Sequence, residues 1–335
     1  MNNLFAQPMR WIFPLVATIV LTTACGSGPE ESAPASPRTV STVSVPTFNA
    51  DSAFAFVAAQ VAFGPRVPGS AAHAACADYL EATLQRFTEH VYRQPFAARA
   101  WNQKVLNGYN IIGSFNPEAR KRLLLCAHWD SRPYADHDPD PANHNTPIDG
   151  ANDGASGVGV LLEVARIIHE YGIDVGVDII FFDLEDYGEP QGTFSGNRDT
   201  WALGSQHWAR SPHIPGYQAN FGILLDMVGA ENATFSMEGY SMTYAPDIVR
   251  RVWRNAHQIG YGNFFLMQES NPIIDDHYYI NTIARIPTIN IIHQDPTTPH
   301  GFFPYWHTVE DTIDKIDPNT LTAVGQTVLH TLWHF

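Results

Sequence analysis

The sequence predicts an α/β fold in a single domain, with a mostly parallel, twisted central sheet flanked by helices. Continuous apolar runs such as VDIIFFD at 177–183 are typical of strands that are buried on both faces of a sheet. Between these runs lie segments with apolar residues at helical spacing, and strands that alternate with helices favour a parallel sheet. The 335 residues, 44% of them hydrophobic, are enough for one large domain of this kind.

The first 25 residues are expected to be a signal peptide. Arg10 precedes an apolar stretch at 11–21, which is too short to span a bilayer and is typical of the hydrophobic part of such a segment. Small residues before Cys25 resemble a bacterial lipoprotein cleavage box and predict a lipid anchor on Cys25. The alternative is plain secretion after Ala24.

The folded part is expected to span 48–335, after a flexible tether. Residues 26–47 are rich in Ser, Pro, Glu and Thr and cannot bury a core. The protein is therefore expected to be exported to the cell envelope, in the periplasm or at the outer membrane. In that oxidising compartment Cys76 and Cys126 could pair, although a buried free thiol fits Cys126 within its apolar strand equally well.

Helices and strands can be placed from their hydrophobic patterns. Helices are expected at 51–64, 72–87 and 155–172, and strands at 106–115, 120–130, 177–183, 221–229 and 286–293. The first two strands look like neighbours in the sheet. The intervening loop 132–153 has no helix or strand pattern. Its segment 136–144 has the acid density of a calcium loop but lacks the required glycine and spacing, so we expect a solvated surface loop.

The charge and the residue content narrow the function classes. The 19 basic and 34 acidic residues give a net charge of −15, which argues against binding to nucleic acid or to an anionic membrane surface. The 15 histidines, together with clustered acids, make a metal site worth seeking.

Acidic and histidine residues recur where the predicted strands end. They are His128 and Asp130, Glu185 and Asp186, Asp226 and His293, joined by Asp153 before the 155–172 helix and by His307 near the C-terminus. Binding residues gather beyond the carboxyl ends of the strands in such sheets. Carboxylates and imidazoles suit zinc, and a catalytic zinc needs three protein ligands and a nearby group that moves protons. The adjacent Glu185 and Asp186 suit that division of roles.

The order of the motifs resembles the zinc aminopeptidase-like (M28-type) superfamily. The motifs are FGPRVPGSAAH, CAHWDS, GANDGASGVGVLLE, FFDLEDYG, LLDMVG and YWHT, and they cover roughly residues 50–335. Within this superfamily DDHYYI, INIIH and the Trp directly before the last His resemble the bacterial glutaminyl-peptide cyclotransferases, which are relatives of the animal glutaminyl cyclases.

The resemblance implies roles for individual residues. It implies one zinc ion held by Asp153, Asp186 and His307, with Glu185 as the general acid/base. It also implies a hydrogen-bonded pair between Asp226 and Asp275 and a cis Asp153–Gly154 peptide bond. Asp186 departs from the family, where Glu is frequent at this position. The substrate pocket is expected to include Trp306, His293, Phe303 and Trp201. Asp183 and Glu189, in the same acidic stretch as Glu185, receive no role.

The function implied is that of a zinc-dependent acyltransferase, which converts the N-terminal glutamine of peptides or proteins to pyroglutamate and releases ammonia. One alternative is an aminopeptidase with two zinc ions, in which His128 and Asp226 would join the three ligands. A second is a non-catalytic surface lipoprotein on the same fold. We expect no nucleic-acid partner, membrane contact only through the lipid anchor, and a monomer.

Overall fold

A computed structural model describes residues 44–196 and 199–335. The predicted signal peptide, Cys25 and nearly all of the tether lie outside these residues. In chain order the elements are α1 (Ala50–Val61), α2 (Ala71–Gln85), β1 (His90–Arg99), β2 (Val105–Phe115), β3 (Arg122–His128), η1 (Pro141–Asn143), α3 (Ala155–Tyr171), β4 (Gly176–Phe182), α4 (Leu203–Arg210), β5 (Phe221–Asp226), β6 (Phe235–Met237), α5 (Gly239–Tyr244), α6 (Pro246–Gln258), β7 (Phe265–Glu269), α7 (Asp276–Tyr279), η2 (Ile280–Ala284), β8 (Thr288–Ile292), η3 (Ile313–Lys315) and α8 (Pro318–Trp333). All eight predicted helices and strands are confirmed.

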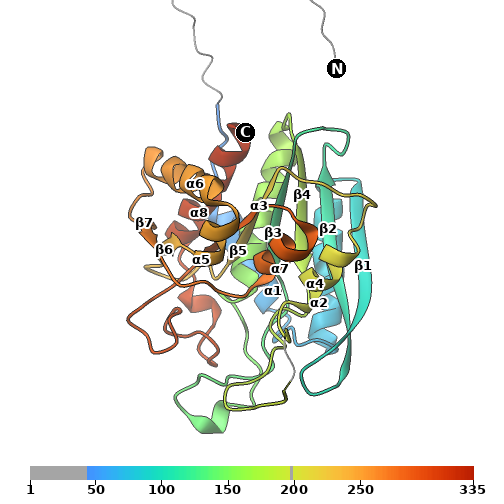
Figure 1. The fold of residues 1–335 in the computed structure, drawn as a ribbon, viewed down its shortest axis with the longest axis vertical. Coiled ribbons are helices and arrows are strands. Elements are labelled where there is room, and N and C mark those ends of the chain that lie inside the picture. The colour runs from blue at the N-terminus through green and yellow to red at the C-terminus, as the bar shows by residue number, and fades with distance from the viewer. Residues whose placement is uncertain (1–43, 197–198) are drawn as a thin grey trace, which may run out of the picture. The chain divides into compact units, whose positions relative to one another are not determined.

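The central sheet has the order β1-β2-β4-β3-β5-β8 (Figure 1). Strands β4, β3, β5 and β8 are parallel to one another, whereas β1 and β2 form an antiparallel hairpin that continues onto β4. The expectation that β2 and β3 are neighbours is wrong, because β4 lies between them. Strand β4 is apolar and buried along its whole length, which suits an interior position.

Helices cover both faces of the sheet. Alternate residues of β3 point to opposite sides: Leu123 and Leu125 pack in the cluster formed with α1, α2, α3, α6 and α8, while Leu124 and Cys126 pack in the cluster with Trp208 of α4. Period-two alternation of this kind is the geometry of a strand that is buried on both sides. Cys76 and Cys126 are both buried free thiols, so the disulfide alternative is wrong.

Local signals mark the ends of several helices. Asn49 and Ser70 cap α1 and α2 by accepting hydrogen bonds from Ser52 N and His73 N. In the part of the chain that the structure describes, no helix is long and apolar enough to cross a membrane.

Candidate active site

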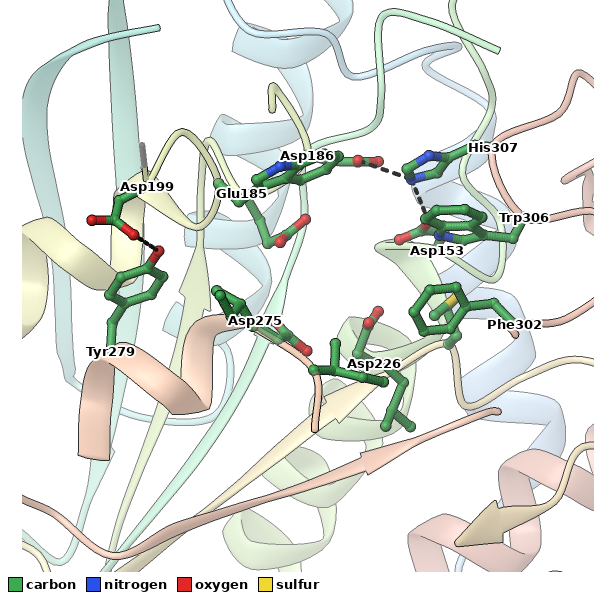
Figure 2. A pocket seen from close by; sticks show the side chains of 15 residues that line it. Asp153, Glu185, Asp186, Asp199, Asp226, Asp275, Tyr279, Phe302, Trp306 and His307 are labelled. Atoms are coloured by element: carbon green, nitrogen blue, oxygen red, sulfur yellow. Dashed lines mark hydrogen bonds and ion pairs between the residues drawn. The ribbon is translucent and has the colours of Figure 1, made fainter. Parts of the chain in front are cut away.

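A cavity of about 320 Å³ opens beyond the carboxyl ends of β4 and β5. Its wall contains the strand-end acids Glu185, Asp186 and Asp226, and also Asp153, which lies two residues before the start of α3 (Figure 2). His307 reaches the same cavity from the C-terminal loop. The topology therefore brings together side chains that are far apart in sequence, as expected at the carboxyl edge of a parallel sheet.

Asp153, Asp186 and His307 form a compact triad that is large enough for one metal ion. One ligand atom from each lies within 4.8 Å of the others. His307 Nε2 is 3.2 Å from Asp186 Oδ1 and 3.5 Å from Asp153 Oδ2. All three side chains are buried, and Asp186 Oδ2 has no hydrogen-bond partner among the described residues.

The electrostatics of the triad favour a bound cation. Burial, together with the neighbouring charge of Asp153, raises the pKa of Asp186. The buried carboxylates of Asp153 and Asp186, with oxygens within 4.8 Å of each other, repel each other unless a positive charge lies between them. Two carboxylate oxygens and one imidazole nitrogen are a donor set that suits zinc with an open coordination position.

A second group of three shares Asp153 with the triad. His128 Nε2 is 3.1 Å from Asp153 Oδ1 and 3.2 Å from Asp226 Oδ1. Ligand atoms of His128, Asp153 and Asp226 also lie within 4.8 Å of one another. Asp153 therefore occupies the position of a bridge between two adjacent sites.

Glu185 belongs to neither group, although it lines the same cavity. Burial and the negative charges of Asp186 and Asp275 raise its pKa well above the usual value for a glutamate, against the opposing effect of His128. A carboxyl group with a raised pKa beside a cavity is a candidate proton carrier.

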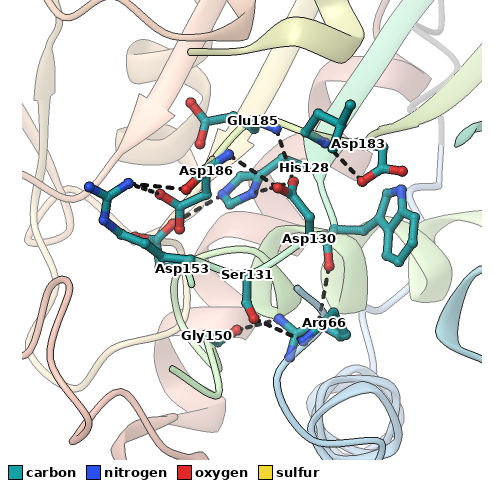
Figure 3. Close-up of polar contacts among 12 residues, drawn as sticks. Arg66, His128, Asp130, Ser131, Gly150, Asp153, Asp183, Glu185 and Asp186 are labelled. Carbon is teal, nitrogen blue, oxygen red and sulfur yellow. Dashed lines mark hydrogen bonds and ion pairs between the residues drawn. The ribbon is translucent and has the colours of Figure 1, made fainter. Parts of the chain in front are cut away.

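The backbone after β4 is held so that Glu185 and Asp186 diverge. Asp130 accepts hydrogen bonds from the backbone N–H of Glu185 at 3.1 Å and of Asp186 at 3.2 Å, and its Oδ1 lies 3.6 Å from His128 Nδ1 (Figure 3). Leu184 adopts the left-handed region with φ of 57°, which turns the chain between the strand and these two acids. A single buried carboxylate thus holds the backbone of Glu185 and Asp186 and lies beside the His128 ring.

Residues 110–332 match the model of Peptidase family M28. The chain belongs to this family. The solved structures similar to this M28 chain include a zinc-dependent exopeptidase from Parabacteroides distasonis, at 54% identity and a TM-score of 0.86, which covers 87% of this chain and 100% of that chain. Another is the glutaminyl cyclase of Bacteroides thetaiotaomicron bound to N-acetylhistamine, at 52% identity, a TM-score of 0.85 and the same two coverages.

A curated relative of this M28 chain is the glutaminyl-peptide cyclotransferase of the snake Bothrops jararaca. It is 26% identical over an alignment of 247 residues, and the match covers 65% of this chain and 62% of the snake protein. The match therefore leaves more than a third of the snake protein uncovered, whereas the two bacterial structures are covered in full.

Two aromatic walls enclose His307 in the M28 site. The Trp306 ring stacks on the His307 imidazole with ring centroids 3.7 Å apart. The Trp201 ring is also nearly parallel to this imidazole, with ring centroids 6.0 Å apart. Both indoles line the cavity, where Trp306 and Trp201 were predicted.

Three expectations for the M28 site differ from the structure. His293 and Phe303 do not line the cavity; their chain neighbours Ile292 and Phe302 do. Successive residues of an extended segment point to opposite sides, so the side chains that face the cavity are those of the preceding residues. Phe303 instead packs fully buried in a cluster with Ile292.

The second difference concerns Asp226 and Asp275, which both line the cavity but hydrogen-bond to other groups. Asp226 is paired with His128, and Asp275 Oδ2 accepts from Asn290 Nδ2 at 2.6 Å. Burial and the charges of Asp275 and Asp153 raise the pKa of Asp226 to about 7, despite the hydrogen bond with His128.

The third difference is the peptide bond between Asp153 and Gly154, which is trans. Gly154 has φ of 106°, and a Cβ atom there would lie 2.6 Å from the carbonyl oxygen of Asp130. The chain thus turns toward the site through a conformation that needs glycine.

The Asp153 loop is held by two buried residues that sequence reasoning missed. Asp311 accepts hydrogen bonds from the backbone N–H of Asn152 at 2.8 Å and of Asp153 at 3.0 Å. Arg66 donates to the backbone carbonyls of Trp129 and Gly150 from the other side. Arg66 lies in the FGPRVPGS motif, which the sequence analysis singled out without assigning a role to Arg66.

Asp183 supports the site from outside the cavity. Both of its carboxylate oxygens lie 2.9 Å from His73 Nε2, and they also accept from the backbone N–H of Tyr109 and Leu184. Glu189 accepts a hydrogen bond from Ser195 N within the following loop. Asp199 and Tyr279, at the edge of the cavity, were also missed, and the Tyr279 hydroxyl donates to Asp199 at 3.4 Å.

Proposed function

We propose that this protein is a zinc-dependent glutaminyl-peptide cyclotransferase. The observation that carries the proposal is the similarity of this chain to the glutaminyl cyclases of B. thetaiotaomicron and Tannerella forsythia, at 52% and 53% identity over the full length of both. The cavity, with the expected acids and aromatic walls, supports it. The substrates are peptides or proteins that begin with glutamine.

The ligands of a single zinc ion are Asp153, Asp186 and His307 in this proposal. Asp186 Oδ2 has no hydrogen-bond partner among the described residues, and the carboxylates of Asp153 and Asp186 repel each other. Both observations are consistent with a cation between these two side chains. When bound, zinc would polarise the side-chain amide carbonyl of the glutamine as a Lewis acid.

Glu185 moves the proton in the proposed reaction. It accepts a proton from the neutral α-amine as the amine nitrogen bonds to the side-chain carbonyl carbon of the glutamine. It returns that proton to the amide nitrogen as the bond between carbon and nitrogen breaks and ammonia leaves. One proton thus passes from the nucleophile to the leaving group, and a five-membered lactam results.

Other cavity residues orient the glutamine. Asp226 and Asp275 face the same space as Glu185 and accept N–H groups of the amine and of the departing nitrogen (Figure 2). Trp201 and Trp306 cover the methylene groups of the side chain and exclude water. Holding both reacting groups in one small cavity favours ring closure over hydrolysis.

A two-zinc aminopeptidase is the second candidate, because His128, Asp153 and Asp226 complete an adjacent metal group and the P. distasonis relative is described as an exopeptidase. The test measures ammonia released from a glutamine-initiated peptide, hydrolysis of leucyl-amide, and zinc per chain on the same sample. Ammonia release with one zinc supports the cyclotransferase. Leucyl-amide hydrolysis with two zinc ions and no ammonia would overturn it.

The proposal extends to location. Export, a lipid anchor at Cys25 and a monomeric state rest on the sequence alone. The mass of the mature N-terminal peptide would test the lipid anchor. The elution volume of the protein in gel filtration would test the monomeric state.

A further inference from the structure

The segment 136–144 is only partly the solvated surface loop that its composition predicts: residues 139–142 are exposed, but Asp136 and Asp138 are buried, as is Arg132 just before the segment. Arg132 is 1% exposed, and the acids Asp136 and Asp138 are 7% and 6% exposed. The loop lies against the C-terminal segment, because the backbone N–H of His137 donates to the carbonyl of His307 at 3.1 Å.

Arg132 and Asp136 form a buried two-bond ion pair. Arg132 Nε donates to Asp136 Oδ1 and Arg132 Nη2 donates to Asp136 Oδ2, each at 2.7 Å. Asp136 Oδ2 also accepts from Gln191 N at 2.8 Å. Both carboxylate oxygens are therefore engaged, so Asp136 serves as a hydrogen-bond acceptor rather than as a third ligand beside His137 and His307.

The pair touches both sides of the metal triad. Asp136 Oδ1 is 3.4 Å from His307 Nδ1. Arg132 Nη1 donates to the backbone carbonyl of Asp186 at 3.0 Å and lies 3.5 Å from its Oδ1. The guanidinium carbon also lies 4.6 Å from the ring centroid of Trp201, a wall of the cavity.

We propose that the Arg132–Asp136 pair is the positioning device of the zinc site. His307 Nδ1 has no hydrogen-bond partner in the described structure, and Asp136 Oδ1, 3.4 Å away, is the acceptor that this inference assigns to its N–H. A proton held on Nδ1 leaves Nε2 free for the metal, while Arg132 holds the backbone of Asp186 and the Trp201 ring in place. Partners of this kind fix the tautomer and the orientation of a ligating histidine, and their loss lowers metal affinity by about 10- to 100-fold. This inference rests on the proposed zinc ligands.

Asp138 provides a matched control within the same loop. It is as buried as Asp136, but its oxygens accept from the backbone N–H groups of Asp140 and Val309 and from the side chain of Asn143. It therefore anchors the loop and contacts no side chain of the metal triad in the described structure. A purely structural role of the loop would make Asp136→Asn and Asp138→Asn equivalent.

The experiment measures the zinc dissociation constant of the full chain by competition with a chromophoric chelator, alongside the melting temperature. Asp136→Asn should weaken zinc binding about 10- to 100-fold. Asp138→Asn should lower the melting temperature and change the zinc dissociation constant by less than about threefold, since it leaves the partner of His307 intact. Arg132→Lys, which keeps the charge but not the planar fork, should also weaken zinc binding.

Each outcome decides the inference. Unchanged zinc affinity in a folded Asp136→Asn, or equal weakening in Asp136→Asn and Asp138→Asn, would overturn it. Should Asp136→Asn not fold, Arg132→Lys decides in the same way. Wild-type protein that binds no zinc would instead overturn the proposed function, and the inference with it.

Discussion

Replacing Glu185 by glutamine tests the proton carrier directly. The change keeps the shape of the side chain and removes only its ability to take up a proton. The backbone of residue 185 stays anchored by its hydrogen bond to Asp130 at 3.1 Å. Glu185 is in neither metal group, so the ligands Asp153, Asp186 and His307 remain intact.

The expected loss is in turnover rather than in stability or metal content. A positioned acid/base contributes about 10²- to 10⁴-fold, which corresponds to about 2.7–5.5 kcal/mol of activation free energy. Glutamine has the same size and shape as glutamate, so the packing around residue 185 is kept. We therefore expect the free energy of unfolding to change by no more than about 1 kcal/mol, the net worth of one hydrogen bond.

The assay couples ammonia release from a glutamine-initiated peptide to a zinc count on the same preparation. Asp186→Asn, a change at the adjacent residue, is the matched control and should lose zinc and activity together. A Glu185→Gln protein that keeps a rate within about threefold of wild type would refute the acid/base role, since general acid/base catalysis is worth far more. Loss of zinc in Glu185→Gln would show that the residue acts as a ligand instead.

Three further predictions concern the pocket wall, its mouth and the scaffold behind it. In Gly188→Ala the new Cβ would lie 2.0 Å from ring atoms of Trp201, so the indole must move; we expect a higher KM for glutamine peptides, and an unchanged KM would contradict this. Asp199 is exposed at the cavity edge, where it can attract a lysine that follows the N-terminal glutamine of the substrate. Asp199→Asn should therefore reduce the ratio of kcat/KM for a Gln-Lys peptide to that for a Gln-Ala peptide by up to about fivefold, the worth of an exposed charge pair. An equal ratio in both proteins would argue against this role. Burial alone would raise the pKa of Glu238, but the hydrogen bond with His277 and backbone donors lower it to about 2. This pair should stabilise the protein above about pH 4.5, the unfolded value, and lose its contribution as the pH falls toward 2. Glu238→Gln should therefore flatten the dependence of the unfolding free energy on pH over this window, and parallel curves for the two proteins would refute the assignment.

Much of the site could be predicted because its residues lie at predictable places along the chain. Continuous apolar runs mark buried strands, and the carboxyl ends of parallel strands share one edge of the sheet. Glu185 and Asp186 lie three and four residues after the end of β4, and Asp226 is the last residue of β5. Their convergence with Asp153 needs only the fold class, not the detailed coordinates.

Residues that reach the site through loops could not be predicted in this way. Arg132 and Asp136 looked like part of a polar surface loop, and only the docking of that loop on His307 buries them. Ile292 and Phe302 line the cavity instead of their neighbours His293 and Phe303, because the side of an extended segment that faces a cavity depends on its register with neighbouring strands.

The acidic stretch FFDLEDYGE shows where the division lies. The sequence by itself determined that a buried strand ends there in a cluster of carboxylates, since hydrophobic periodicity and strand-end chemistry are local properties. Only the tertiary structure decided what each acid does: Asp183 pairs with His73, 110 positions away in the chain, while Asp186 meets His307. Contacts between distant segments depend on how helices and loops pack around the sheet, and no local pattern encodes that packing.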